Sequence, residues 1–198
     1  MLQAVITYGK PVNRSLCRGV CGDEWSSHVY ELNRMCRREE FRQPLSHFVS
    51  TTLRMLKPLD WIVVSYSDSA MHHHGYVYQA CNFIYTGTSN TNFHDKYNKD
   101  GNFHNRHLGA FSSDSDEFYV ERSPKYRYVY FCASSKSVRK RMQEAFRYKS
   151  LPYPKGDNSN YELGNFIGKT VVNVKTGDKT EIPNESRIEG NGDRLFLF

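Results

Sequence analysis

The segment that most constrains the fold is residues 60–87, which read DWIVVSYSDSAMHHHGYVYQACNFIYTG. Residues 61–65 form a compact apolar run with β-branched side chains, which favours a buried strand over a helix. The serines and aspartate at 67–69 are typical of a turn. A helical spacing of apolar residues returns over 74–82, and residues 84–86 indicate another strand. The segment therefore predicts a strand, a loop, a short helix and a second strand.

The preceding sequence extends this pattern toward the N-terminus. Residues 3–8 alternate well enough for a strand, and residues 29–35 predict another. Between them, residues 9–28 are rich in Gly, Ser, Cys and Arg, which indicates an ordered loop. Residues 44–56 predict a helix that begins at a proline and carries one apolar stripe. With the strand at 61–65 they form a strand–helix–strand unit, for which we expect a right-handed crossover.

The second half of the chain is harder to interpret. Residues 88–117 are polar and predict a long insertion or loop. Residues 118–120 and 127–132 resemble a pair of strands around a proline-containing turn, and 138–146 predict a basic amphipathic helix. After a linker-like segment, residues 170–183 carry the signal of a β-hairpin. We therefore expect an α/β domain followed by a small C-terminal β appendage.

Charge indicates the kind of partner to expect. The 198 residues carry a formal net charge of +6, and the pI is about 9.0, which implies attraction to polyanions. Basic residues are concentrated at 136–155 and, diluted by two glutamates, at 34–42. Phosphates held by such groups would release counterions, so binding would weaken steeply with salt. The alternative interpretation is a solvated helix face.

The cysteines and the apolar runs bear on location. The five cysteines are odd in number and scattered, which favours a reducing compartment over a disulfide framework. Cys17 and Cys21 can begin a metal site only with further ligands, and ordinary thiols are the preferred interpretation. No run approaches the ~20 apolar residues of a membrane span, and residues 1–10 do not resemble a secretory signal. We expect a cytoplasmic protein.

Several segments together resemble the Mom family of phage DNA-modification proteins, which are distant relatives of the GNAT acyltransferases. They occur in the order ITYGKPVNRSLCRGVCGDEW (6–25), VYELNRM (29–35), SYSDSAMHHHGYVYQACNFIYTG (65–87), KYRYVYF (125–131) and PYPKG (152–156). The resemblance implies a GNAT-like mixed, twisted sheet flanked by helices. It covers roughly residues 4–156, so we expect a modification domain at 1–156 and a tail at 157–198, to which the sequence assigns no role.

The resemblance also implies an activity. Mom-type proteins place a carbamoylmethyl (glycinamide-derived) group on the exocyclic amine of adenine in double-stranded DNA, which protects phage DNA from restriction nucleases in the bacterial host. Two alternatives stay open. One is a GNAT-fold N-acyltransferase that acts on another amine, and the other is a non-catalytic DNA-binding protein on the same scaffold. The oligomeric state is open, with a homodimer as one option.

Four residues are candidates for the chemistry. Tyr78 lies five residues before Phe83, as does a GNAT tyrosine whose hydroxyl stands near the acyl-CoA sulfur, and its phenol can protonate a leaving group. Tyr66 and Asp68 follow a strand, where ligand sites of open α/β sheets gather. Asp68 can activate the amine or cap a helix, and Glu31 can act as a general base or pair with an arginine. For Tyr78 the alternative is a helix tyrosine with a surface hydroxyl.

In GNAT enzymes, backbone amides at a helix start hold the pyrophosphate of the donor, and the corresponding helix here begins near Ser46. Helix N-termini suit phosphate because their N–H groups are free. The glycine-rich turn of ordinary GNAT enzymes is missing, and Arg37, Arg38 and Arg42 can replace some backbone donors with charge-assisted bonds. The donor is therefore acyl-CoA or another glycyl or acyl carrier, and an ordinary helix start is the alternative.

The sequence also offers candidate residues for DNA contacts and for a metal. Basic and aromatic residues interleave on one predicted strand and on the following helix, and a base flipped out of the duplex can stack on the aromatic faces. The DNA-binding candidates are Lys125, Arg127, Tyr128, Arg139, Lys140 and Arg141. Histidines 72–74 cannot all bind one metal. The metal is left unassigned, with iron as the transition metal considered.

Overall fold

The computed structural model describes residues 2–38, 40–69, 73–89, 94–97, 103–107, 118–121, 123–156, 169–182 and 196–197. Four α-helices lie in these ranges: α1 (Arg14–Trp25), α2 (Leu45–Leu56), α3 (Tyr76–Ala80) and α4 (Lys136–Glu144). Short 3₁₀ turns, Ser26–His28 and Lys57–Leu59, follow α1 and α2. The helices predicted at 44–56, 74–82 and 138–146 are confirmed within a few residues.

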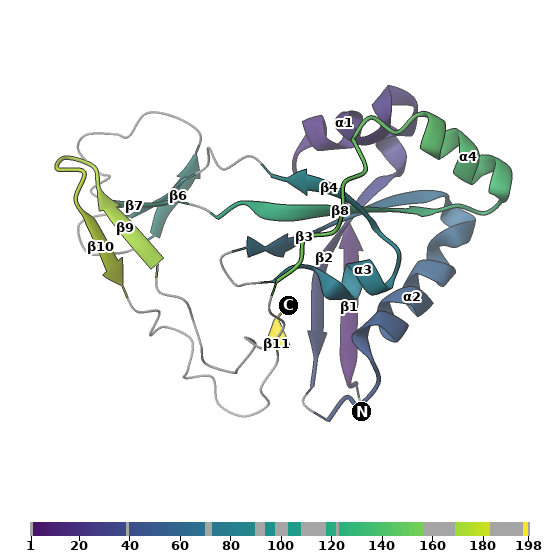
Figure 1. Ribbon diagram of the computed structural model, residues 1–198, viewed down its shortest axis with the longest axis horizontal. Helices are drawn as coiled ribbons and strands as arrows, with labels where there is room; N and C mark the ends of the chain where they lie inside the picture. Colours follow the sequence, from purple (N-terminus) through teal and green to yellow (C-terminus); the bar gives the residue numbers. More distant parts are fainter. Residues whose placement is uncertain are drawn as a thin grey trace.

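The main sheet has the strand order β1-β2-β3-β8-β4, and a short sixth strand, β11 (Phe196–Leu197), pairs with β2. Its strands are β1 (Ala4–Gly9), β2 (Val29–Arg37), β3 (Trp61–Asp68), β8 (Lys125–Cys132) and β4 (Ile84–Thr88). The pair formed by β2 and β3 is parallel, and α2 connects these two strands. The pairs β1–β2, β3–β8 and β8–β4 are antiparallel. This mixed α/β sheet with four helices confirms the predicted fold class and is consistent with a GNAT-like architecture (Figure 1).

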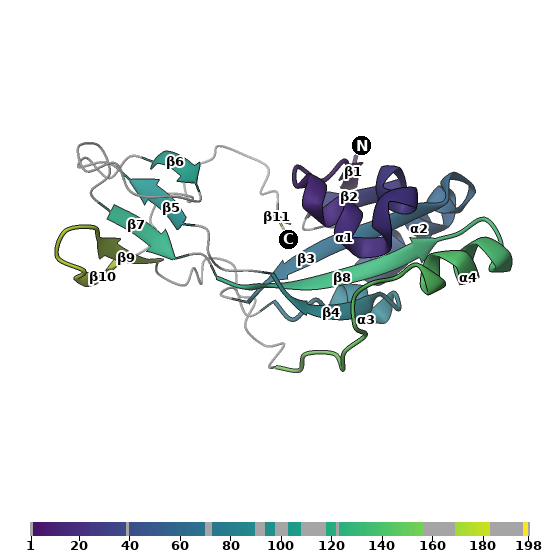
Figure 2. The ribbon, with the colours of Figure 1, turned by 90° about the horizontal axis from the view of Figure 1, so that it is seen from above.

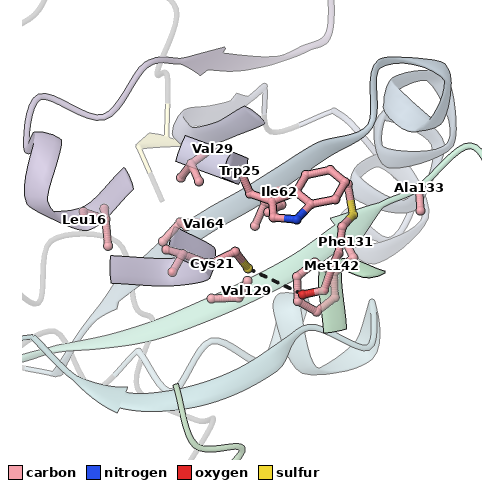
Figure 3. Close-up of a cluster of buried hydrophobic side chains, with 11 residues drawn as sticks. Leu16, Cys21, Trp25, Val29, Ile62, Val64, Val129, Phe131, Ala133 and Met142 are labelled. Carbon is pink, nitrogen blue, oxygen red and sulfur yellow. Dashed lines mark hydrogen bonds between the residues drawn. The ribbon is translucent and has the colours of Figure 1, made fainter. Parts of the chain in front are cut away.

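Helices cover both faces of the main sheet. One face packs against α1 and α4, where Val20, Trp25 and Met142 join Ile62 and other strand residues in a buried cluster (Figure 3). The Cys21 thiol donates to the Met142 carbonyl across this cluster at 3.6 Å. The opposite face packs against α2 and α3 in a second buried cluster (Figure 2). That cluster consists of Leu32, Met35, Val49, Leu53, Val63, Tyr78, Cys81, Phe83, Tyr85, Tyr128 and Cys132.

A second sheet contains strands from the predicted insertion and from the tail, in the order β10-β9-β7-β5-β6. The strands are β5 (His94–Tyr97), β6 (Phe103–His107), β7 (Phe118–Glu121), β9 (Lys169–Asn173) and β10 (Lys179–Ile182). The predicted hairpin is confirmed as β9–β10. The predicted pairing of 118–120 with 127–132 is wrong, because β7 pairs with β5 and β9 while β8 pairs with β3 and β4. The boundary proposed at residue 157 stays a prediction.

The loop predicted for residues 9–28 is also wrong, because α1 occupies most of it. The Asn13 side chain accepts from the Ser15 amide and caps the helix start. The helix is interrupted at Cys21 and Gly22, where Gly22 has a φ of 80°. A Cβ on Gly22 would lie 2.6 Å from an Arg147 Nη, so this glycine makes room for the arginine as well. Glycine and serine content masked a helix whose apolar residues pack on the sheet.

The segment 146–156 wraps the β4 edge of the sheet. The Leu151 amide donates to the Tyr85 carbonyl at 2.9 Å, and the Tyr153 hydroxyl donates to the Phe83 carbonyl at 2.7 Å. Farther along, the Gly156 amide donates to the Tyr76 hydroxyl at 3.1 Å. These contacts cover the open edge of β4 and tie it to α3. Among the helices in the described ranges, none has the length and apolarity that spanning a bilayer requires.

Candidate active site at the fork between two parallel strands

The parallel strands β2 and β3 separate shortly after they meet. They pair only from Val29 to Glu31 on β2 and from Ile62 to Val64 on β3. Beyond these pairs, β2 continues to Arg37 and β3 continues to Asp68. The short strand β11 pairs with Cys36 and Arg37 of β2, and it lies on the fork side because β1 pairs with the same two residues on the other side. We call these diverging halves, residues 31–37 and 64–68, the fork. It lies at the carboxyl ends of the two strands, where ligands of open α/β sheets bind.

Pairing with the neighbouring strands β1 and β8 sets the directions of β2 and β3 in the fork. On the outer side of β2, the register with β1 shifts, because Tyr8 is opposite Leu32 while Thr7 is opposite Arg34. Asn33 is therefore an extra residue in β2, and such a bulge bends the strand that contains it. On the other arm, β3 stays paired with β8 along its whole length, up to Asp68 opposite Lys125. The fork is thus a consequence of how β1 and β8 hold β2 and β3.

Glu31 stands where the two strands part. Since Glu31 is paired with Val64, its side chain leaves the sheet on the face that Val64 and Tyr66 share, the α1 face. Burial raises the pKa of the Glu31 carboxyl above its usual 4.5, and the positive charges of Lys125 and Arg34 partly oppose this shift. A carboxyl with a raised pKa is a better proton acceptor at neutral pH than an ordinary glutamate.

Tyr78 approaches the fork from the opposite face. It lies on α3, is almost fully buried, and packs its ring against Phe83 with centroids 5.3 Å apart. Burial raises its pKa above 10, and the nearby Ser65 hydroxyl opposes this shift. The charge of Glu31 raises the Tyr78 pKa further, so the two groups sense each other although they belong to opposite faces. Tyr78 is therefore protonated at neutral pH, so in a proton transfer it can act as the donor and not as the base.

Tyr66 belongs to a polar cluster on the α1 face with Arg127, Thr86 and Tyr148. Arg127 donates from Nε to the Thr86 hydroxyl at 2.8 Å and from Nη2 to the Thr86 carbonyl at 3.2 Å. Its guanidinium carbon lies 3.8 Å from the centroid of the Tyr148 ring. Burial raises the pKa of Tyr66 to about 12, although Arg127 lowers it. Arg127, predicted to contact DNA, is thus held by the protein beside Tyr66.

Asp68 is clamped at the tip of β3. The Ser123 hydroxyl donates to its Oδ1, and Lys125 Nζ lies 3.7 Å from its Oδ2. The backbone of the same lysine is paired with Ser89, whose amide donates to the Lys125 carbonyl at 2.8 Å. Lys125 therefore stands between two acids, since its charge also acts on Glu31. The Asp68 carboxylate is therefore placed to hold Lys125 at the tip of β3.

The predicted donor-binding residues are all near the start of α2. No side chain caps this helix, and Ser46 lies in its first turn, where backbone amides are free to bind an anion. Arg37 ends β2 and donates from Nη1 to the Phe41 carbonyl at 3.3 Å, while Arg42 is exposed in the connecting loop. The Arg38 amide donates to the Gln3 carbonyl at 2.8 Å, which fixes this end of the fork.

The predicted DNA-binding residues do not form one surface. Lys125 lies at the fork, but Arg139, Lys140 and Arg141 lie on α4, which follows the opposite end of β8. Arg141 pairs with Glu24 at 3.1 Å, and Arg139 donates to the Phe131 carbonyl at 2.9 Å.

Tyr128, by contrast, is a fully buried core residue whose hydroxyl donates to the His74 carbonyl. The prediction that Tyr128 faces DNA is therefore wrong, because α3 and Gly75 cover that face of β8.

Of the three adjacent histidines, His72 lies outside the described residues. The His74 ring stacks on Tyr126 with centroids 5.7 Å apart, and its Nδ1 is buried without a hydrogen-bond partner among the described residues. Within those residues, His, Cys, Asp and Glu side chains form no group of three that could hold a metal.

Residues that the sequence analysis missed at the site are Ser65, Thr86 and Tyr148. Alternation along β3 could have placed Ser65 on the face opposite Tyr66.

Two comparisons with known proteins bear on this site. The model of the Mom protein family matches residues 1–155, which include every residue of the fork. The chain is also similar to the protein named methylcarbamoylase mom of Escherichia phage Mu. The two are 28% identical over 170 residues, an alignment that covers 78% of this chain and 68% of the phage Mu protein.

Proposed function

The chain belongs to the Mom protein family, and on this premise we propose that it is a DNA-modifying transferase. The reaction we propose is transfer of a carbamoylmethyl group to the exocyclic amine of adenine. The name of the phage Mu relative, methylcarbamoylase, supports a group of this kind. The observation that carries the proposal is the position of Glu31 at the last β2–β3 pair and of Tyr78 on the opposite face, near enough for the charge of Glu31 to raise the Tyr78 pKa. Glu31 is able to accept a proton and Tyr78 to donate one.

In the transfer, the adenine nitrogen forms a bond to a carbon of the donor while the bond from that carbon to its carrier breaks. The amine loses one proton, and Glu31 accepts it. The departing carrier group receives a hydrogen bond, or the proton itself, from the Tyr78 hydroxyl. Two titratable groups whose surroundings suit them to opposite tasks are typical of acid–base catalysis, and each is worth roughly 10²–10⁴ in rate.

The donor would lie beside β2 on the Glu31 side of Cys36, since β11 pairs with Cys36 and Arg37, and its phosphates or other anionic groups would face the uncapped start of α2. Ser46 contributes its backbone amide there, and Arg37, Arg38 and Arg42 contribute charge. The class of donor that fits is an anionic acyl or glycyl carrier, of which acyl-CoA is one example. Tyr78 on α3 is then close to the reactive carbon at the other end of the donor.

The acceptor would enter from the α1 face, where Glu31, Tyr66 and Lys125 lie. An exocyclic amine inside a duplex is out of reach of these side chains, so the adenine is expected to be flipped out, at a cost of a few kcal/mol. Aromatic and guanidinium planes, such as Tyr66 and Arg127, are the groups on which an extruded base stacks. Phosphate contacts would supply most of the affinity and make it sensitive to salt.

The experiment is mass spectrometry of nucleosides from plasmid DNA that is co-expressed with the protein in bacteria. We expect a new deoxyadenosine species with the mass of an added carbamoylmethyl group, and its loss with Tyr78→Phe and Glu31→Gln. Tyr76→Phe is the matched control for the first variant, since it removes a hydroxyl from the same helix that bonds to Gly156 instead of facing the fork. Glu24→Gln, at the surface beside Arg141, is the control for the second.

Two results would replace the proposal. Unmodified DNA together with binding of acyl-CoA by the purified protein would indicate an N-acyltransferase for another amine. Unmodified DNA with salt-sensitive DNA binding that is indifferent to Tyr78→Phe would indicate a binding protein without catalysis. Full modification by both Tyr78→Phe and Glu31→Gln would keep the activity but remove these residues from the mechanism.

A further inference from the structure

The two edge strands of the main sheet differ in whether another segment of the chain covers them. At one edge, β4 is covered by the segment 146–156, which supplies the Leu151 amide to the Tyr85 carbonyl at 2.9 Å. At the other edge, β1 pairs with β2 and with no other strand in the described part of the chain (Figure 1). One side of β1 therefore has backbone N–H and C=O groups that the sheet does not use. Such an edge is a template for another strand.

Natural sheets protect free edges with charges, prolines or bulges in the edge strand. The sequence of β1, AVITYG, contains no charged residue and no proline. The bulge in this region belongs to β2, where Asn33 is the extra residue, so β1 itself stays regular. Apolar exposure adds to the effect, since Val5 of β1 is 37% exposed and Leu2, just before the strand, is 70% exposed. Within the described residues, the outer edge of β1 is therefore unpaired, and its strand is uncharged.

From these features we propose that β1 is an interaction surface for a second copy of this chain. Two β1 strands would pair antiparallel across a two-fold axis and join the two main sheets into one. An isologous contact of this kind needs a surface that is complementary to itself, and an uncharged edge strand meets that need. The chain carries a net charge of +6, so most surfaces of two copies repel, and the β1 edge brings no charge to the contact.

The proposed contact has a defined size and leaves the fork free. Six residues at about 3.4 Å each give an edge of roughly 20 Å, and an antiparallel pair of that length forms about six backbone hydrogen bonds. Because the axis is perpendicular to the sheet, the two Val5 side chains project from the same face and can cover each other. The fork lies on the other side of β2, so dimerisation does not close either active site, and this inference is independent of the proposed function.

The experiment compares the molar mass in solution of the wild type, Val5→Lys and Val12→Lys, by sedimentation velocity over a range of concentrations. We expect a wild-type dimer, and a dissociation constant at least tenfold higher for Val5→Lys, since it brings two like charges onto one face of a sheet edge. Val12→Lys is the matched control, because it makes the same chemical change at a fully exposed valine just after β1. It should dimerise as the wild type does.

Hydrogen exchange on the wild type provides a readout that does not depend on a variant. Amides of residues 4–9 that face away from β2 should become protected as the protein concentration rises, while amides of β4 should not change. The proposal is overturned if the wild type is a monomer at every concentration. It is also overturned if the dimer forms without protection of residues 4–9, or if Val5→Lys and Val12→Lys weaken it equally. Thermal melts of both variants ensure that loss of the fold is not mistaken for loss of pairing.

Discussion

The replacement of Gly75 by alanine tests how α3 is fixed at the site. Gly75 precedes the helix that carries Tyr78 and has a φ of 70° and a ψ of 32°, in the left-handed region. That conformation costs a residue with a Cβ about 1–2 kcal/mol. The added Cβ would also lie 2.5 Å from Cε2 of Tyr128, a fully buried ring that has no room to retreat. Overpacking of this kind costs about 1–3 kcal/mol, so we expect Gly75→Ala to destabilise the fold by about 2–5 kcal/mol in all.

A second glycine isolates the packing contribution. Gly177 has nearly the same φ, 73°, but a Cβ there would meet no atom within 4 Å. Gly177→Ala should therefore cost only the backbone part, about 1–2 kcal/mol. Urea unfolding of both variants gives the two free energies, and DNA modification by the folded fraction of Gly75→Ala should fall because Tyr78 is displaced. Equal destabilisation of the two variants would refute the claim that Tyr128 fixes Gly75.

Three further predictions concern charge and packing. Lys125→Met should move the acid side of the pH–rate profile to higher pH, because the lysine lowers the pKa of Glu31, the proposed base; an unmoved profile would argue against this role. Burial gives Glu31 a higher pKa in the folded protein than in the unfolded chain. The contribution of Glu31 to stability is therefore fully present below its unfolded pKa, and it is lost as the pH rises through its folded pKa. Glu31→Gln should therefore raise the melting temperature relative to wild type at pH 8 but not at pH 4, as calorimetry can check. Met142→Ala should cost about 2–5 kcal/mol in urea unfolding, while Met55→Ala, at a residue that is 72% exposed, should cost little.

The elements predicted correctly are those whose apolar residues follow one clear helical or strand spacing. Residues 44–56 combine a proline start with an apolar stripe, and α2 matches them within a residue. Residues 61–65 are apolar because β3 is buried on both faces, and the observed strand continues to Asp68. The segment 9–28 was predicted incorrectly as a loop because it is polar on average. Its few apolar residues, Leu16, Val20 and Trp25, nevertheless pack on the sheet. Strand pairing over long separations, such as β7 with β9, leaves no local trace in the sequence.

At the site, too, the sequence predicts which residues of one strand share a face, but it does not predict contacts between distant segments. Alternation along β8 indicates that Lys125 and Arg127 share one face and Tyr126 and Tyr128 the other. It does not reveal which face a helix covers, so the sequence predicts a DNA contact for Tyr128, a residue that belongs to the core. The partners that hold Arg127, namely Thr86 and Tyr148, come from a neighbouring strand and from the segment after α4. No spacing rule connects positions so far apart.

The fork explains how side chains on opposite faces of the sheet can influence each other. In a closed sheet, neighbouring strands are about 4.8 Å apart, and their hydrogen-bonded backbones separate the side chains of one face from those of the other. Glu31 leaves β2 toward the α1 face, and Tyr78 is part of the cluster on the α3 face. The charge of Glu31 nevertheless raises the pKa of Tyr78, at the level where the β2–β3 ladder has just ended. Since the bulge at Asn33 bends β2 while β8 holds β3, the coupling between the proposed base and the proposed donor depends on two strands that supply neither of them.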